Sequence, residues 1–320
     1  MINFYTHAGR FHCDEVLAFV LFDMFTSSLV KVHRLRDLKG LDEIQEGIVV
    51  DIGRKYDPEA LRFDHHQMQL YRKGGTGTIY ASAGLIWKHY GYAIANKYLD
   101  EYEEPADVYR FCDIVDRLLI SGVDAHDADE DYEVWGQCAQ DGMVMENLHI
   151  TTLSNVVGMF NHFDVNDDWR QMRNFEQAAA ILRTVVVATF ERAASIIKYR
   201  NKYVWHLARV EQTDRVMDVL DWQAELLQEG GDINVAALVD LSEDNPEPAF
   251  LLMRSAHPGN KYQLLALSEH PETRRLRLPI ERRGGFDGFI HNNKFIAGHD
   301  DPEVLRKLAA DNVLDSKAPF

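Results

Sequence analysis

Cysteine is scarce in this sequence of 320 residues, which contains only Cys13, Cys112 and Cys138, with no CxxC pair. Three cysteines at this spacing provide neither a disulfide framework nor a zinc ribbon, and they fit a reducing compartment. No apolar run approaches the length that spans a bilayer. The first residues also lack the basic stretch and the apolar stretch of a secretion signal. We therefore expect a cytoplasmic protein without a membrane partner.

Positive charge is also in short supply. The sequence has 34 lysines and arginines against 51 acidic residues, a net charge of −17. Long duplex nucleic acid is bound mainly through lysine and arginine that neutralise its phosphates, so the charge predicts no long-duplex partner. Small phosphorylated molecules can still bind where bound cations supply a local positive field. The charge therefore excludes one class of partner and leaves phosphate chemistry open.

The chain is too long for one ordinary core, and its 46% hydrophobic and 27% charged residues are typical of a folded protein. In the first half, short apolar runs alternate with helical patterns, which predicts a mainly parallel α/β sheet. The predicted strands are 2–6, 29–35, 47–53 and 61–64, and the predicted helices are 14–24, 82–99 and 105–120.

The second half begins with a stretch almost free of glycine and proline, 168–199, which predicts a long helix that connects two domains. Turn-rich segments beyond it predict two hairpins and a smaller α/β domain. Its predicted strands are 215–220, 249–254, 262–267, 286–290 and 294–297, followed by a closing helix, 301–310. We place the boundary so that the first domain is 1–200, including the connecting helix, and the second is 201–320.

Histidine and aspartate gather directly after the predicted strands of the first half. In an open α/β sheet, ligands collect at the carboxyl ends of the strands, so these side chains could meet in one crevice. The clusters are the segment 6–15 with its two histidines and Asp14, then Asp51, then Asp64-His65-His66, and last Asp124.

Each cluster also has a purely structural interpretation. Asp14 could cap the helix that it opens, the pair His65-His66 could be packed in the core, and Asp124 could lie in a solvated acidic loop after a helix. Asp51 is harder to explain in this way, because a carboxylate in a buried strand needs a partner or a metal.

Together the clusters supply carboxylates and imidazoles from separate segments, without thiolates. Such donors favour Mn²⁺, or else Mg²⁺, over a structural zinc, although they leave zinc open. Two ions about 3.5–4 Å apart activate water and hold the oxygens of a phosphoryl displacement. The sequence therefore predicts a site for two divalent metal ions.

These motifs resemble the DHH phosphoesterase superfamily and, more closely, its Myg family (the melanocyte-proliferating-gene type), whose members are described as 3′–5′ RNA exonucleases. The resemblance extends over essentially the whole chain. The matching segments are THAGRFHCDE (6–15), VVDIG (49–53), RFDHHQ (62–67), SAGLI (82–86), VDA (123–125), TTLS (151–154), GFIH (288–291) and FIAGH (295–299).

The resemblance implies a role for each matching residue. His66 would face the scissile phosphate, with Asp64 as the second catalytic residue, and Asp51 would be the carboxylate that bridges the two ions. His12 departs from the pattern, since many DHH enzymes have aspartate there. The implied metal ligands are His7, His12, Asp14, Asp51, His65 and Asp124.

The resemblance also implies that the first domain is the metal-binding catalytic domain and the second binds substrate, with the active site in the cleft between them. In the second domain, Gly298 and His299 would hold a substrate phosphate or nucleotide end. His291, Arg282 and Arg283 lie nearby in the sequence and could add positive charge.

The function expected on these grounds is that of a metal-dependent phosphodiesterase, a 3′–5′ exonuclease on short single-stranded RNA or oligonucleotides. Two alternatives stay open: a phosphohydrolase for pyrophosphate or cyclic dinucleotides, and a non-catalytic regulator that binds metal or nucleotide. The oligomeric state also stays open, a homo-oligomer included.

Overall fold

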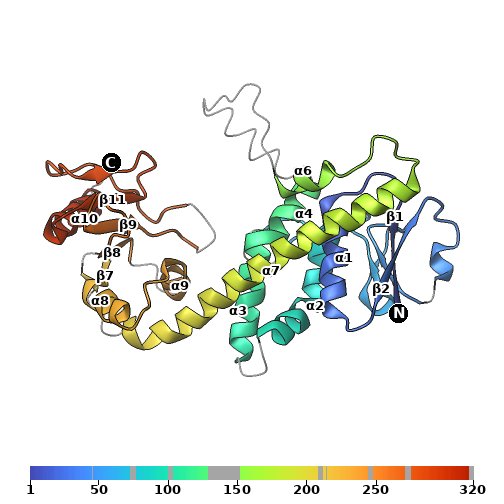
Figure 1. Cartoon of the computed structure of the whole chain (residues 1–320), viewed down its shortest axis with the longest axis horizontal. Helices are drawn as coiled ribbons and strands as arrows, with labels where there is room; N and C mark the ends of the chain where they lie inside the picture. The colour runs from blue at the N-terminus through green and yellow to red at the C-terminus, as the bar shows by residue number, and fades with distance from the viewer. Residues whose placement is uncertain are drawn as a thin grey trace. The chain divides into compact units, whose positions relative to one another are not determined.

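The computed structural model describes residues 1–44, 46–72, 77–99, 104–128, 152–207, 212–213, 215–243, 248–270 and 275–316 (Figure 1). Cys138 and Thr151 lie outside these residues. The chain forms two compact units, Met1–Ala194 and Ser195–Phe320. The division falls within the long helix α7 (Asp168–Leu207), which also contains the predicted boundary after residue 200.

The sheet of the first unit has the strand order β2-β1-β3-β5-β4. Every neighbouring pair is parallel except β4 and β5, which are antiparallel. The three residues of β3 are fully buried, as its uninterrupted apolar run predicts for a strand covered on both faces. The predicted α/β class with a mainly parallel N-terminal sheet is confirmed. The strands are β1 (Ile2–His7), β2 (Val30–Leu35), β3 (Ile48–Val50), β4 (Tyr56–Asp57) and β5 (Arg62–Phe63).

The helices of this unit include α1 (Cys13–Phe25), which packs along α2 (Ser82–Leu99). The predicted helix 105–120 is present and extends further than expected. It begins as α3 (Pro105–Val115), passes through a π-helical turn at Asp116–Ile120, and continues as α4 (Ser121–Asp127).

Asp124 therefore lies within a helix, where a loop was expected. The helix continues because Ile120 and Val123 are buried on it and give it an apolar face to pack. The sequence pattern also did not indicate the short helix α6 (Leu153–Gly158), whose six residues are too few for a clear periodicity.

The second unit contains a mixed sheet with the strand order β10-β11-β9-β8-β7-β6. Both predicted hairpins are antiparallel, with β8 against β9 and β10 against β11. The strands are β6 (Gln212–Thr213), β7 (Val216–Asp218), β8 (Phe250–Arg254), β9 (Tyr262–Ala266), β10 (Phe289–Ile290) and β11 (Ile296–His299).

Two short helices that were not predicted, α8 (Leu220–Gln228) and α9 (Val235–Leu241), connect the parallel strands β7 and β8. The closing helix α10 (Pro302–Ser316) buries Leu305 and Leu308 in a core with Leu264 and Ala297 of the sheet. None of the helices in the described part of the chain has both the length and the apolar character that crossing a membrane requires.

Candidate metal centre

The loop between β1 and α1 carries the first two histidines. It passes through Gly9, whose φ of +89° is favourable for glycine. His12 is the N-cap of α1, and its backbone N–H donates to the Glu15 carboxylate at 2.9 Å. Asp14 is therefore not the cap of this helix. Asp14 and Glu15 are fully buried in the first helical turn, where the helix dipole favours carboxylates.

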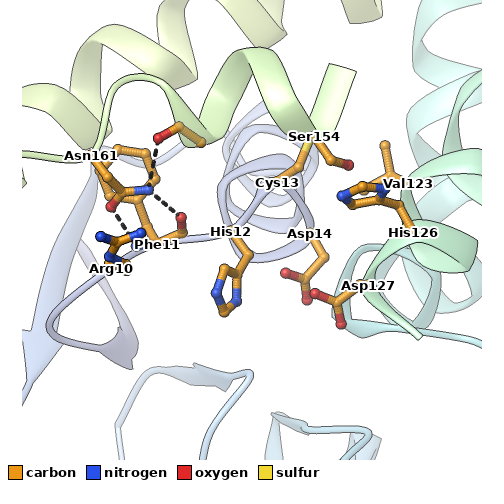
Figure 2. Close-up of a pocket in the computed structure, with 11 residues that line it drawn as sticks. Arg10, Phe11, His12, Cys13, Asp14, Val123, His126, Asp127, Ser154 and Asn161 are labelled. Atoms are coloured by element: carbon orange, nitrogen blue, oxygen red, sulfur yellow. Dashed lines mark hydrogen bonds between the residues drawn. The ribbon is translucent and has the colours of Figure 1, made fainter. Parts of the chain in front are cut away.

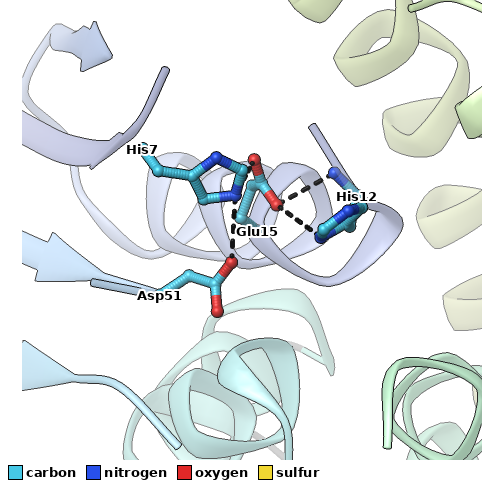
Figure 3. Close-up of side chains that lie close together, drawn as sticks. All are labelled: His7, His12, Glu15 and Asp51. Carbon is cyan, nitrogen blue, oxygen red and sulfur yellow. Dashed lines mark hydrogen bonds and ion pairs between the residues drawn. The ribbon is translucent and has the colours of Figure 1, made fainter. Parts of the chain in front are cut away.

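Four side chains from three segments meet at the start of α1 (Figure 3). His7 Nε2 lies 3.0 Å from Glu15 Oε1 and 3.4 Å from Asp51 Oδ2. His12 Nδ1 lies 3.9 Å from Glu15 Oε2. His7, His12, Glu15 and Asp51 can each offer a ligand atom within 4.8 Å of the others, which is a spacing that could hold one metal ion.

Asp51 connects this group to the next one. It follows β3 with a φ of +63°, and it is 4% exposed. The Ser82 hydroxyl donates to Asp51 Oδ1 at 3.1 Å, and His65 Nε2 lies 3.3 Å from the same oxygen. One carboxylate oxygen thus faces His7 and the other faces His65. Asp51, His65 and His66 form the second group with metal-ligand spacing.

The Asp64 carboxylate orients His66. Asp64 is buried, and its Oδ1 accepts hydrogen bonds from the backbone N–H and Nδ1 of His66, at 2.9 and 2.7 Å. Its Oδ2 accepts the Arg54 N–H at 2.6 Å. Because these bonds use both oxygens, the carboxylate fixes the loop, while the half-exposed His66 ring reaches solvent.

The third group is formed by His12, Asp14 and Asp127. His65 Nε2 lies 3.1 Å from Asp127 Oδ2, which links this group to the second one. Both oxygens of Asp14 are buried and have no hydrogen-bond partner among the described residues. Ionised carboxylates of this kind need a cation. The group borders a cavity of about 300 Å³ that Arg10 and Asn161 also line (Figure 2).

The structure thus joins five of the six predicted ligands with His66 and two residues that the sequence did not single out, Glu15 and Asp127. A helical pattern that continued past Asp124 would have indicated Asp127, one turn further along. We call this set the histidine–carboxylate cluster; it consists of His7, His12, Asp14, Glu15, Asp51, His65, His66 and Asp127.

Asp124, the sixth predicted ligand, is not brought into the groups found among the described residues. Its Oδ2 accepts a hydrogen bond from Arg72 Nη2 at 2.6 Å, and its Oδ1 accepts the Gly84 N–H at 3.0 Å. Arg72 also donates to Asp116, at 2.9 Å. The carboxylate is fully buried, and burial raises the pKa of Asp124 to about 6 against the opposing effect of Arg72. Its role as a ligand stays a prediction.

The carboxylates of the histidine–carboxylate cluster make its electrostatic potential strongly negative. Burial and the neighbouring Asp51 and Asp127 raise the pKa of Asp14 well above its usual value. Burial alone would lower the pKa of His7, but Glu15 and Asp51 raise it to about 11. In the same way, Asp127 and Asp51 outweigh burial and raise the pKa of His65 to about 10. The cluster is thus an environment that favours positive charge.

The donor set fits divalent cations. Four carboxylates, those of Asp14, Glu15, Asp51 and Asp127, balance the charge of two such ions when they are all ionised. Carboxylate oxygens with imidazole nitrogens are typical ligands of Mn²⁺ and of other first-row divalent ions.

The five predicted substrate residues of the second unit do not form a single group. His291 and Gly298 line a cavity of about 540 Å³ together with Phe289 and Phe295. Arg282 instead donates to the carbonyl oxygens of Phe286 and Gly288, and Arg283 pairs with Asp315 at 2.5 Å.

His299 is the last residue of β11. Its Nδ1 accepts the Asp301 N–H at 2.9 Å, and its Nε2 lies 3.5 Å from an Asp287 oxygen. The ring is therefore positioned by Asp301, which follows it in the chain, and by Asp287, which precedes β10. The substrate-binding roles of these five residues stay predictions.

Comparisons with known proteins give a consistent result. Residues 3–313 match the model of a family, MYG1_exonuc, described as Uncharacterised protein family (UPF0160). The chain is 26% identical to the MYG1 exonuclease of Mus musculus over 339 residues, which cover 98% of this chain and 85% of the mouse protein. It is 25% identical to the MYG1 exonuclease of Homo sapiens over 329 residues, 95% of this chain and 84% of the human protein. No solved structure matches the chain.

Proposed function

Because the chain belongs to the MYG1_exonuc family (UPF0160), we propose that it is a metal-dependent exonuclease that acts on short single-stranded RNA or other oligonucleotides. The observation that carries the proposal is the histidine–carboxylate cluster, in which three groups of described residues have metal-ligand spacing. His12 links the first group to the third, and Asp51 links the first to the second. Relatives that cover nearly the whole chain are named exonucleases.

Two divalent ions would be held by this cluster, and Mn²⁺ fits its mixture of oxygen and imidazole donors better than Mg²⁺. His7, His12 and Glu15 would hold one ion, His65 and Asp127 the other, and Asp51 would contact both. When bound, the ions would activate water and offset negative charge on the phosphoryl group. Asp14, whose buried oxygens have no hydrogen-bond partner in the part of the chain that the structure describes, would complete the site.

His66 would act on the substrate directly. Its ring is half exposed, and the Asp64 carboxylate holds its Nδ1, so Nε2 can be directed toward a phosphate at the surface of the cluster. A hydrogen bond from Nε2 would stabilise negative charge that develops on the phosphoryl oxygens. Asp64 would serve by fixing the orientation of this ring.

Short substrates suit the charge of the chain. With a net charge of −17, the protein repels a long polyanion outside the region that bound cations neutralise. The proposed direction of cleavage, 3′ to 5′, rests on the family resemblance.

The test is a hydrolysis assay with the purified full chain after removal of metal by EDTA. We expect no cleavage of a short RNA labelled at its 5′ end until Mn²⁺ or Mg²⁺ is added back, and then stepwise shortening from the 3′ end. Pyrophosphate and a cyclic dinucleotide are assayed in parallel. Full activity in the metal-free protein, or hydrolysis of these small substrates alone, would contradict the proposal.

A further inference from the structure

We propose that Asn161 is a positioning residue of the metal centre, which acts by clamping the peptide groups of Phe11 and so fixing the loop between His7 and His12. The proposal rests on the proposed function, since it takes the histidine–carboxylate cluster to be a cation site. It assigns a role to a residue that lies 150 positions from the loop in the sequence.

The clamp consists of two hydrogen bonds to one residue (Figure 2). The Phe11 N–H donates to Asn161 Oδ1 at 2.8 Å, and Asn161 Nδ2 donates to the Phe11 carbonyl oxygen at 2.7 Å. The carboxamide thus pairs with the backbone as a neighbouring strand would. Phe11 is fully buried, and buried backbone groups need such partners, so removal of the amide would leave two of them unsatisfied.

The loop needs support because it has no regular structure of its own between β1 and α1. It must nevertheless hold the rings of His7 and His12 with their centroids 5.6 Å apart. A second contact comes from Arg34 of β2, which donates to the Gly9 carbonyl oxygen at 2.9 Å. Arg34 fixes the first half of the loop and Asn161 the second half, directly before His12.

The spacing of the metal ligands depends on the backbone position of His12. This histidine belongs to two of the three groups with ligand spacing, so a shift of its backbone changes the spacing in both. Residues that orient metal ligands affect metal affinity without touching the metal. Asn161 fits that role, because the hydrogen bonds to Phe11 already use both its amide oxygen and its amide nitrogen.

The experiment compares Asn161→Ala and Asn161→Asp with wild type and with the control Asn166→Ala. Asn166 lies in the same segment, but its side chain bonds Arg36 on the surface. Hydrogen exchange of the Phe11 amide is measured in the metal-free proteins. Mn²⁺ affinity is measured by titration calorimetry, and the rise in Tm on adding Mn²⁺ by thermal unfolding.

For Asn161→Ala we expect Phe11 exchange to be faster, Mn²⁺ affinity to fall by about tenfold or more, and the Mn²⁺-induced rise in Tm to shrink. Asn161→Asp should keep Phe11 exchange close to wild type, because a carboxylate oxygen can still accept the N–H. Its Mn²⁺ affinity should fall by an intermediate factor, because the bond to the Phe11 carbonyl is lost. The control should match wild type in all three measurements. In the RNA assay, the kcat of Asn161→Ala should fall, while its KM stays within twofold of wild type.

Mn²⁺ affinity of Asn161→Ala within twofold of wild type would overturn the proposal, as would an equal loss of Tm with and without Mn²⁺ at unchanged affinity. If Asn161→Ala does not fold, Asn161→Asp decides, and wild-type affinity in that variant overturns the proposal. Failure of the proposed function looks different, because then the wild-type protein itself binds no Mn²⁺ or binds it without cleaving RNA.

Discussion

Two sets of buried and partly buried carboxylates in the N-terminal unit differ in the source of their positive charge. Asp116 and Asp124 share the guanidinium of Arg72, which is itself 6% exposed, so this ion-pair network is complete within the protein. In the histidine–carboxylate cluster, Asp14 has no hydrogen-bond partner among the described residues, and Asp51 faces histidines. Carboxylates with their own arginine are structural, whereas carboxylates without one indicate a cation from outside.

Asp51 belongs to two of the groups with metal-ligand spacing. We therefore expect its substitution to have the largest effect on turnover. Asp51→Asn removes the charge that faces both His7 and His65, so it should lower turnover of a short RNA by about 10³-fold or more, the effect of losing several kcal/mol of charge stabilisation. Asparagine tolerates the φ of +63° at this position, so the circular dichroism spectrum should stay that of wild type. Wild-type turnover in this variant would remove Asp51 from the site.

Substitution of Arg72 tests the other side of the comparison. Arg72→Met leaves the buried Asp124 and the partly buried Asp116 without their cation. It should lower the free energy of unfolding by about 3–5 kcal/mol, measured by urea denaturation. The matched control is Arg283→Ala, which breaks the exposed pair with Asp315 and should cost no more than about 1 kcal/mol. A loss in Arg72→Met as small as that in the control would show that the network is not a structural ion pair.

Helix α4 carries one carboxylate of each kind: Asp124 pairs with Arg72, and Asp127 belongs to the histidine–carboxylate cluster. Asp127→Asn should weaken Mn²⁺ binding by about 10- to 100-fold, because Asp127 lies beside Asp14 and His65. Asp124→Asn should leave Mn²⁺ affinity within a few-fold of wild type and lower stability instead. Calorimetric titration of both variants checks this, and the opposite order would support Asp124 as the ligand in place of Asp127.

The smallest effect is expected in the C-terminal unit. His299→Ala should raise KM for an oligonucleotide by about five- to tenfold, the loss of roughly one orienting contact, and leave metal content unchanged. A minimal chromogenic phosphodiester that does not use this contact should be hydrolysed at the wild-type rate. Equal slowing of both substrates, or loss of metal, would place His299 in the catalytic centre instead.

Much of the fold could be predicted because its signals are local. The alternation of apolar runs and helical periods predicted most strands and the starts of the long helices within a few residues, and both hairpins followed from their turns. Three helices extend further than predicted, to Asp127, Leu207 and Ser316. The two-residue strand β4 and the helices α6, α8 and α9 could not be found in this way. Elements this short are stabilised by the sheet or core that they join, and their own periodicity is too weak to indicate them.

By itself, the sequence determined the fold class and most of the histidine–carboxylate cluster, since polar residues at the ends of parallel strands must converge at one edge of the sheet. Only the tertiary structure showed that Asp127 lies beside Asp14 and His65. Asp124 and Asp127 lie one helical turn apart, and what separates them is that Asp124 meets Arg72, 52 residues away in the chain. Likewise, Asn161 reaches Phe11 only through the fold. Such contacts depend on where distant segments pack, and no local pattern of residues encodes that.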